Sequence, residues 1–286
     1  MTCVALVSDI HGNLPALEAI VADIRRWQPD AVYVLGDMTN GACWSGAVLD
    51  LLVHLGWPML IGNHDDAVLQ LGSARMEPRY ANRQQYAALW WTRQNLLPRH
   101  LTTLESLPVD RHLSAPDAPP VRLLHGLPGD FSRGFRPDTP ERRAVSQLST
   151  VAERTVAGGH THVPMERRFG EWLVFNSGSV GVPYDGDVRA SYLRLQGSPD
   201  GWRAEIHRVP YALRAVEQGF QESGLAAEGG VMARMCLRSI LSGQPWIADY
   251  AWWLRSQPPE VMTDVDRAEQ SYMATHGLGR WSFSEV

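Results

Sequence analysis

The chain has 286 residues, of which 44% are hydrophobic and 20% are charged, and its formal net charge is −5. This composition is typical of one large or two modest globular domains, and it argues against a disordered chain and against nucleic acid as the main partner. No apolar run approaches the roughly 20 residues that span a bilayer, and the three cysteines show no CxxC spacing, so we expect a cytoplasmic protein without membrane contact or a disulfide framework.

The first sixty residues alternate between expected strands and expected helices. Apolar runs at residues 4–7, 31–35 and 58–61 are typical of buried strands. Between the first two runs, apolar residues recur at helical spacing after Asn13, which we expect to cap that helix. Another helix is expected between the second and third runs. This alternation predicts an α/β sandwich.

Residues 69–100 are rich in arginine and aromatic side chains and are expected to form a helical insertion. Two interpretations are open: a cap over the substrate, or an amphipathic structural helix, which we favour. Residues 114–120, rich in proline and aspartate, are expected to form a loop before an apolar run at 121–124. The polar stretch from Gly129 to Pro140 is typical of a long surface loop.

The second half of the chain contains four further apolar runs that predict strands, the last two as a hairpin: residues 156–157, 173–175, 191–195 and 202–207. From about Pro210 onward the pattern is helical to the end. We therefore predict one main domain over residues 1–208 and a helical C-terminal extension over residues 209–286 that packs on it.

Five of the apolar runs are followed at once by a polar cluster. These clusters are Ser8-Asp9-Ile10-His11-Gly12-Asn13, Gly36-Asp37, Gly62-Asn63-His64-Asp65, His125-Gly126 and Gly158-Gly159-His160-Thr161-His162. Because binding sites of α/β sheets lie beyond the carboxyl ends of strands, we expect the clusters to converge. Five of the ten histidines fall in them, which a random scatter would not produce.

The clustered side chains form a mixed oxygen and nitrogen ligand set without sulfur, which suits Mn²⁺, Fe, Zn²⁺, Co or Ni better than a structural zinc or calcium site. Seven residues are of ligand type: Asp9, His11, Asp37, Asn63, His125, His160 and His162. They suffice for two ions if one carboxylate bridges, and two metals about 3.5–4 Å apart form a clamp for in-line displacement at phosphorus. We expect two divalent ions, with manganese as the first choice.

The order DxH, GD, GNHD, H and GHTH resembles the calcineurin-like metallophosphoesterase superfamily, and within it the small bacterial phosphodiesterase-like branch. The resemblance covers about residues 4–180. It implies a four-layer α/β/β/α sandwich, here with a helical insertion and a helical C-terminal segment. It also implies a dimetal-dependent phosphoesterase in which a metal-bridging hydroxide attacks phosphorus in line.

The resemblance also implies a role for each residue of the motifs. The first metal would be bound by Asp9, His11 and His162. The second would be bound by Asn63, His125 and His160, and Asp37 would bridge the two metals. His64 would be a catalytic residue that faces the leaving group as general acid or charge stabiliser. Asp65 is the second catalytic candidate, because its neighbour in the sequence is the histidine it would orient. An acid at a helix start also stabilises the helix dipole without any catalytic role.

One departure from the family pattern bears on the substrate. Protein serine/threonine phosphatases and symmetrically cleaving bis(5′-nucleosyl)-tetraphosphatases extend GD to GDxxDRG, whereas this chain has Asn40-Gly41. The aspartate that pairs with the histidine and the arginine that grips phosphate are both missing. We therefore expect a small phosphorylated or nucleotide substrate with a phosphodiester or phosphoanhydride bond, such as a dinucleoside polyphosphate.

Three other functions stay open at this point. A phosphomonoesterase or protein phosphatase would use the same motifs. Some members of the superfamily have lost metal ligands and serve as interaction scaffolds, but here every ligand position is filled. A nuclease shares the motifs too, although the negative net charge argues against it.

Overall fold

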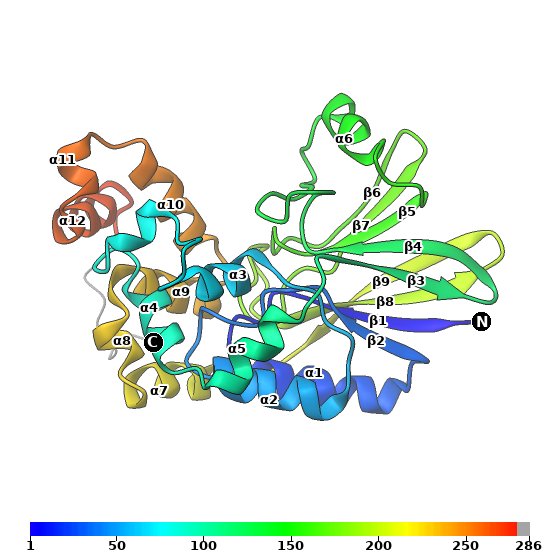
Figure 1. Cartoon of the computed structure of the whole chain (residues 1–286), viewed down its shortest axis with the longest axis horizontal. Helices are drawn as coiled ribbons and strands as arrows, with labels where there is room; N and C mark the ends of the chain where they lie inside the picture. The colour runs from blue at the N-terminus through cyan, green and yellow to red at the C-terminus, as the bar shows by residue number, and fades with distance from the viewer. Residues whose placement is uncertain (279–286) are drawn as a thin grey trace.

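The computed structural model describes residues 1–278 of the chain. Two β-sheets lie face to face with helices on their outer sides, which confirms the predicted α/β sandwich (Figure 1). The first sheet has the strand order β2-β1-β8-β9, with β1 Cys3–Val7, β2 Ala31–Val34, β8 Ala190–Ser198 and β9 Gly201–Val209. The second has the order β3-β4-β5-β7-β6, with β3 Asp110–Ala115, β4 Ala118–Leu124, β5 Thr155–Gly158, β6 Met165–Phe169 and β7 Trp172–Asn176.

Helices cover the outer face of each sheet (Figure 1). Three lie over the first sheet and one over the second: α1 Leu14–Trp27, α2 Ser45–Leu55 and α5 Pro98–Glu105, then α6 Glu141–Leu148. The predicted cap of α1 is confirmed, because the Asn13 side chain accepts a hydrogen bond from the Ala16 amide at 3.2 Å. Parallel pairing of β1 with β2 requires a crossover of this kind, which α1 supplies.

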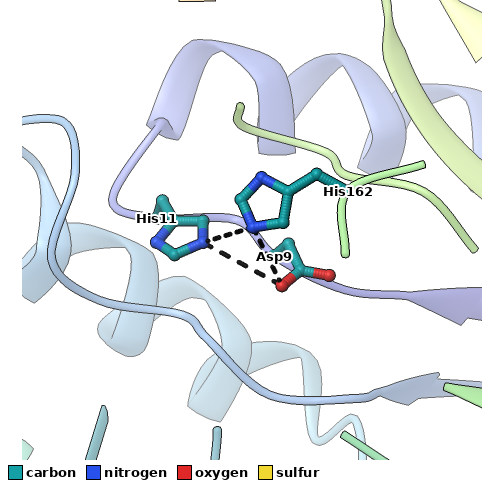
Figure 2. A group of neighbouring side chains, drawn as sticks. All are labelled: Asp9, His11 and His162. Atoms are coloured by element: carbon teal, nitrogen blue, oxygen red, sulfur yellow. Dashed lines mark hydrogen bonds and ion pairs between the residues drawn. The ribbon is translucent and has the colours of Figure 1, made fainter. Parts of the chain in front are cut away.

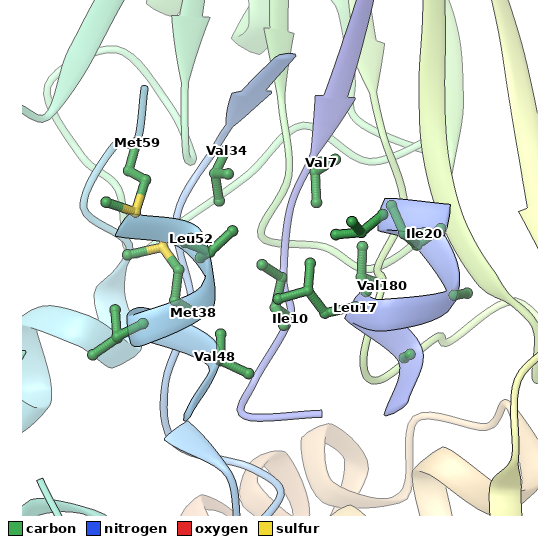
Figure 3. Packing of buried hydrophobic residues seen from close by; sticks show 14 of the residues in the cluster. Val7, Ile10, Leu17, Ile20, Val34, Met38, Val48, Leu52, Met59 and Val180 are labelled. Atoms are coloured by element: carbon green, nitrogen blue, oxygen red, sulfur yellow. The ribbon is translucent and has the colours of Figure 1, made fainter. Parts of the chain in front are cut away.

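Strand β1 is buried on both faces, as the uninterrupted apolar run predicts. Val4 and Leu6 belong to the core between the two sheets, while Ala5 and Val7 belong to the core beneath α1 and α2. Figure 3 shows Val7 on the strand side of this second core, opposite Leu17 of α1. Burial of a side chain of this size stabilises the fold by about 1.5–3 kcal/mol.

The insertion at residues 69–100 is helical but broken into short pieces rather than one long helix. Helix α3 (Asn63–Gln70) ends before Gly72, and η1 (Pro78–Ala81) and α4 (Ala87–Gln94) follow. Two physical features break the pattern: Gly72 has φ +77°, and Pro78 cannot continue a preceding helix.

Two of the expected boundaries are wrong in detail. Residues 114–120 are not a loop, since β3 and β4 extend into them and only a tight turn at Pro116 and Asp117 separates the strands. Prolines are tolerated at the start of β4 because β5 pairs only from Val121 onward. The run at residues 58–61 forms a single bridge, between Met59 and Val34, instead of a full strand. The long loop from Gly129 to Pro140 is confirmed.

The C-terminal segment is helical up to Thr275, and residues 279–286 of the predicted extension lie outside the described residues. Its helices are α7 Leu213–Glu222, α8 Leu225–Glu228, α9 Gly230–Ser242, α10 Trp246–Arg255, α11 Pro259–Met262 and α12 Val265–Thr275. They gather with α4 at the end of the sandwich that lies away from the N-terminus (Figure 1). The division at residue 208 stays a prediction. Within residues 1–278, no helix is long and apolar enough to cross a membrane.

Candidate metal centre

The loops after β1, β2, β4 and β5, with the first turn of α3, meet at one edge of the two sheets. They bring together the seven predicted ligands: Asp9, His11, Asp37, Asn63, His125, His160 and His162. Five of these residues have a left-handed backbone: Asp9 (φ 54°), His11 (49°), Asp37 (54°), His160 (68°) and His162 (59°). Sharp backbone turns of this kind aim consecutive side chains at one point.

The first group of ligand-type atoms belongs to Asp9, His11 and His162, and Figure 2 shows these side chains pointing at one another. The Nε2 atoms of His11 and His162 lie 3.1 Å apart. Asp9 Oδ1 lies 3.4 Å from the Nε2 of His162 and 3.9 Å from that of His11. All three residues are buried, so water screens their charges little.

The second group is formed by Asp37, His125 and His160, with Asn63 beside it. Asn63 Oδ1 lies 3.1 Å from His125 Nε2 and 2.8 Å from His160 Nδ1. Asp37 Oδ2 lies 3.3 Å from His125 Nε2 and 3.7 Å from the Nε2 of His11, which belongs to the first group. Asp37 therefore stands between the two groups, where a bridging ligand would lie.

Backbone carbonyls determine which nitrogen of three histidines can bind an ion. The Nδ1 atoms of His11, His125 and His162 lie 2.9, 2.7 and 2.6 Å from the carbonyl oxygens of Asn40, Leu35 and Val182. A carbonyl only accepts, so each Nδ1 carries a proton and donates it. In the neutral ring, Nε2 then carries no proton, and its lone pair faces the centre of the site. Metal-binding histidines are oriented in this way.

This arrangement fits divalent cations, because acceptors face acceptors. Two imidazole lone pairs 3.1 Å apart cannot hydrogen-bond to each other. Among residues 1–278, no donor is bonded to the buried Oδ2 of Asp37. A buried acceptor without a donor is costly, and a cation between these atoms would satisfy all of them at once. The chemistry of the donor set thus agrees with the two divalent ions that the resemblance implies.

Glycines allow the loops to approach this closely. A Cβ on Gly62 would overlap the Asp37 carboxylate, and one on Gly159 would overlap Ser8 and the Asp9 carboxylate. Any larger residue at either position would displace a predicted ligand.

The charges in the site strongly influence one another. Burial raises the pKa of Asp37, but the positive charge of His125 outweighs it and holds that pKa well below the usual value. Burial lowers the pKa of His160 to about 4. Burial also lowers the pKa of His125, but Asp37 outweighs this and raises it to about 9. A cation beside Asp37 would replace the proton of His125 in balancing that carboxylate.

His64 lies at the rim of the two groups. Its ring stands edge-on to that of His11, with ring centroids 4.8 Å apart. Burial lowers the pKa of His64 to about 3, so the ring is neutral at pH 7. His64 also lies close enough to His11 and Asp37 for the three residues to bind a single ion. That His64 is not a metal ligand therefore stays a prediction.

Asp65 does not orient His64. Its buried carboxylate accepts hydrogen bonds from the amides of Met38, Thr39 and Gly62 and from the Thr39 hydroxyl, at 2.8–3.3 Å. Burial, and then the charge of Asp37, raise the pKa of Asp65 to about 7. The geometry makes Asp65 a clamp on the loop that carries Asp37, and the residue that contacts His64 is Asn40, whose Nδ2 lies 2.8 Å from His64 Nδ1.

Two contacts in the site were not among the predicted residues. Asn40 stands where the GDxxDRG motif has the aspartate that pairs with the histidine, and that correspondence is the signal that could have found its contact with His64. The ring of Tyr184 stacks on that of His162, with centroids 4.3 Å apart and planes 19° apart. Tyr184 lies in a loop without any motif, so only the fold places it there.

The arginines between residues 75 and 99 support the structural interpretation of the insertion. Arg75 pairs with Asp66, Arg99 pairs with Asp50, and Arg83 lies over the ring of Trp90. These three side chains therefore have partners within the fold.

A family model described as calcineurin-like phosphoesterase matches residues 4–164, more than half of the chain. Among solved structures, a metallophosphoesterase from Sphaerobacter thermophilus is 28% identical, with a TM-score of 0.66, and the match covers 85% of this chain and 100% of that one. A hypothetical protein from Pyrococcus horikoshii OT3 has a TM-score of 0.72 at 18% identity, covering 85% and 99% of the two chains, and shows the fold alone. An uncharacterized protein of Methanocaldococcus jannaschii is 27% identical over 230 residues, which are 74% of this chain and 88% of that protein.

Proposed function

The chain belongs to the calcineurin-like phosphoesterase family, and from this premise we propose that it is a dimetal phosphodiesterase. The observation that carries the proposal is the position of Asp37, whose Oδ2 lies within 3.3–3.7 Å of a histidine from each ligand group and has no donor bonded to it among residues 1–278. Every ligand position is filled, which supports an enzyme over a scaffold. The name of the Sphaerobacter relative, a metallophosphoesterase, agrees with this.

Seven residues would hold two ions: Asp9, His11 and His162 on one side, Asn63, His125 and His160 on the other, and Asp37 between them. When bound, the ions would supply positive charge for the phosphate oxygens and a water of lowered pKa for in-line attack. The mixed nitrogen and oxygen donors favour Mn²⁺, with Fe, Zn²⁺, Co and Ni as alternatives. His64 would donate a hydrogen bond to the departing oxygen.

Charge supports a diester as the substrate. Two divalent ions and the two ligand carboxylates, Asp9 and Asp37, sum to +2, and the hydroxide nucleophile takes one of these charges. One positive charge remains, which matches the single negative charge of a diester. A dianionic monoester would need a further cation, and this chain has Gly41 where the GDxxDRG pattern has arginine.

The same argument applies to phosphoanhydride bonds in nucleotides, whose internal phosphates also carry one charge each. A dinucleoside polyphosphate is therefore a natural candidate substrate. We place the enzyme in the cytoplasm as part of this proposal, because Cys3, Cys43 and Cys236 are all free thiols, as a reducing compartment would keep them.

The test compares two chromogenic esters with the same metal loading. We expect kcat/KM for bis-(p-nitrophenyl) phosphate to exceed that for p-nitrophenyl phosphate, because only the diester matches the charge of the site. The metal content of the sample is measured alongside. A ratio well below one would make phosphomonoesterase the better description, and no turnover of either ester by the fully loaded protein would contradict an esterase function.

A further inference from the structure

Asn40 contacts two histidines of the site with two different groups. Its backbone oxygen lies 2.9 Å from Nδ1 of His11, and its side-chain Nδ2 lies 2.8 Å from Nδ1 of His64. The residue has φ +61°, and its own amide donates to Ser45 Oγ at 3.2 Å. This left-handed turn directs the carbonyl and the side chain to two neighbouring rings.

The two contacts have opposite hydrogen-bond directions. His11 must donate from Nδ1, because a carbonyl oxygen only accepts. His64 must accept at Nδ1, because the amide nitrogen of Asn40 only donates. The proton of a neutral His64 ring therefore sits on Nε2, the reverse of the arrangement in His11 and His162, whose Nδ1 atoms both face carbonyls.

We propose that Asn40 is a positioning residue that holds His64 as a neutral ring with its proton on Nε2, where it donates a hydrogen bond to the leaving oxygen of the substrate. The proposal rests on the proposed phosphodiesterase function. Asn40 itself occupies Nδ1, so Nε2 is the ring nitrogen left for the substrate. A hydrogen bond disperses the charge that develops on the leaving oxygen and requires no proton transfer.

An aspartate at position 40 would have the opposite effect. A carboxylate only accepts, so it would draw a proton to Nδ1, and its negative charge would favour the imidazolium over the neutral ring. The GDxxDRG motif has aspartate at this position, so Asn40 marks a different use of the same histidine. The difference is one of hydrogen-bond direction, since asparagine and aspartate have nearly the same shape.

The first experiment reads the tautomer directly in the metal-free protein. We use Asn40→Asp and Asn40→Gly, because both residues tolerate φ +61° and keep the carbonyl that holds His11. Histidine is labelled with ¹⁵N, long-range ¹H–¹⁵N spectra are recorded at pH 7, and His64 is assigned by its absence from the spectrum of His64→Ala.

In the wild-type protein we expect the His64 proton on Nε2, and the protons of His11 and His162 on Nδ1. In Asn40→Asp the Nδ1 atom of His64 gains a proton, and in Asn40→Gly both tautomers are populated. Asn95→Gly, which removes a side-chain amide that donates to Trp91 O within α4, leaves the spectrum of His64 unchanged. A His64 ring whose Nδ1 stays unprotonated in both Asn40 variants would overturn the proposal.

The second experiment uses the dependence on the leaving group. With metal content equal to wild type, Asn40→Gly should lose about 10–100-fold in kcat toward a methyl phosphodiester, the range typical of a lost orienting partner. Toward a p-nitrophenyl diester, whose leaving group needs little help, the loss should stay below about threefold, because the hydrogen bond contributes little there. Equal losses on both esters would show a merely structural role and contradict the proposal. If wild-type protein hydrolyses neither ester, the proposed function fails, while the tautomer spectra still decide the role of Asn40.

Discussion

Strained backbone conformations accompany the predicted ligands. Asp9, His11, Asp37, His160 and His162 all have φ between 49° and 68°, a region that costs a residue with a side chain about 1–3 kcal/mol. Aspartate and histidine tolerate the region better than most residues, and the loops are held on both sides by strands and helices. The fold therefore holds the ligand atoms in place in advance, which reduces the reorganisation that binding an ion would require.

At the residue scale, replacing His64 tests its assignment as a group that acts on the substrate. We expect His64→Ala to lower kcat by about 10²–10³ toward a methyl phosphodiester, because the leaving oxygen loses its hydrogen-bond donor. Metal content should remain that of wild type. The measurement is steady-state kinetics together with metal analysis of the same samples.

His54→Ala is the matched control, since His54 is exposed on α2, and its kcat should be unchanged. If His64→Ala instead loses an ion and regains turnover when metal is added back, His64 is a ligand, as its distance from His11 and Asp37 also permits.

The sequence predicted that the seven ligand-type side chains converge, because residue type and position after a strand carry that information; their role as ligands stays a prediction. It did not predict the partner of His64. Asp65 is adjacent in the sequence, but the first turn of α3 directs its side chain at the loop of Thr39. Asn40 lies 24 residues away at the position where the GDxxDRG motif has the histidine-pairing aspartate, so the motif marked the position but did not show that an asparagine there would keep the contact.

At the scale of elements, Asp65 joins the start of α3 to the loop after β2. Its carboxylate accepts four hydrogen bonds from Met38, Thr39 and Gly62, and all are buried. Asp65→Ala should lower the free energy of unfolding by about 3 kcal/mol or more, because several buried donors lose their acceptor. Urea unfolding of the metal-free protein measures this without any contribution from an ion.

The neighbouring residue supplies the control for this change. Asp66 is partly buried, but its carboxylate bonds only to the side chains of the exposed Arg75 and of Gln70 among the described residues and accepts from no backbone amide there, so Asp66→Ala should cost about 1 kcal/mol. Equal effects of the two substitutions would contradict the role of Asp65 as a clamp.

Whether a strand could be predicted from the sequence depends on its burial and on its neighbours in the sheet. The run at residues 4–7 is buried on both faces and was recognised as a strand. The hairpin of β8 and β9 was recognised as well. The loop around Pro116 and Asp117 was predicted too long, because prolines usually interrupt a strand. Here β4 pairs with β5 only from Val121 onward, so the missing N–H groups of Pro119 and Pro120 remove no hydrogen bond to β5, and the sequence does not show this.

At the scale of the whole molecule, the metal centre connects the two sheets. Asp9, His11 and Asp37 leave the first sheet, and His125 and His160 leave the second. Between the sheets lies an apolar core that includes Leu6, Val121 and Phe175, and no ion is needed to hold that core together. At the edge, however, mutual repulsion of the ligand atoms opposes the fold unless a cation balances it.

Binding of metal should therefore stabilise the entire chain. At a free Mn²⁺ concentration one hundred times the dissociation constant, linkage predicts about 2.7 kcal/mol per site. For a chain of this length that corresponds to a rise in Tm of at least about 5 °C. A chelator should reverse the rise, and differential scanning calorimetry with and without metal measures both.

Asp37→Asn should weaken this response. In the metal-free protein at pH 7 the substitution removes the carboxylate that raises the pKa of His125, so we expect a Tm at or below that of wild type. With Mn²⁺ the rise in Tm should largely disappear, because both ions lose their shared carboxylate. Asp50→Asn, which removes a surface charge that pairs with Arg99, should keep the full metal-induced rise. An intact metal-induced rise in Asp37→Asn would show that Asp37 supports the fold and does not bridge two ions.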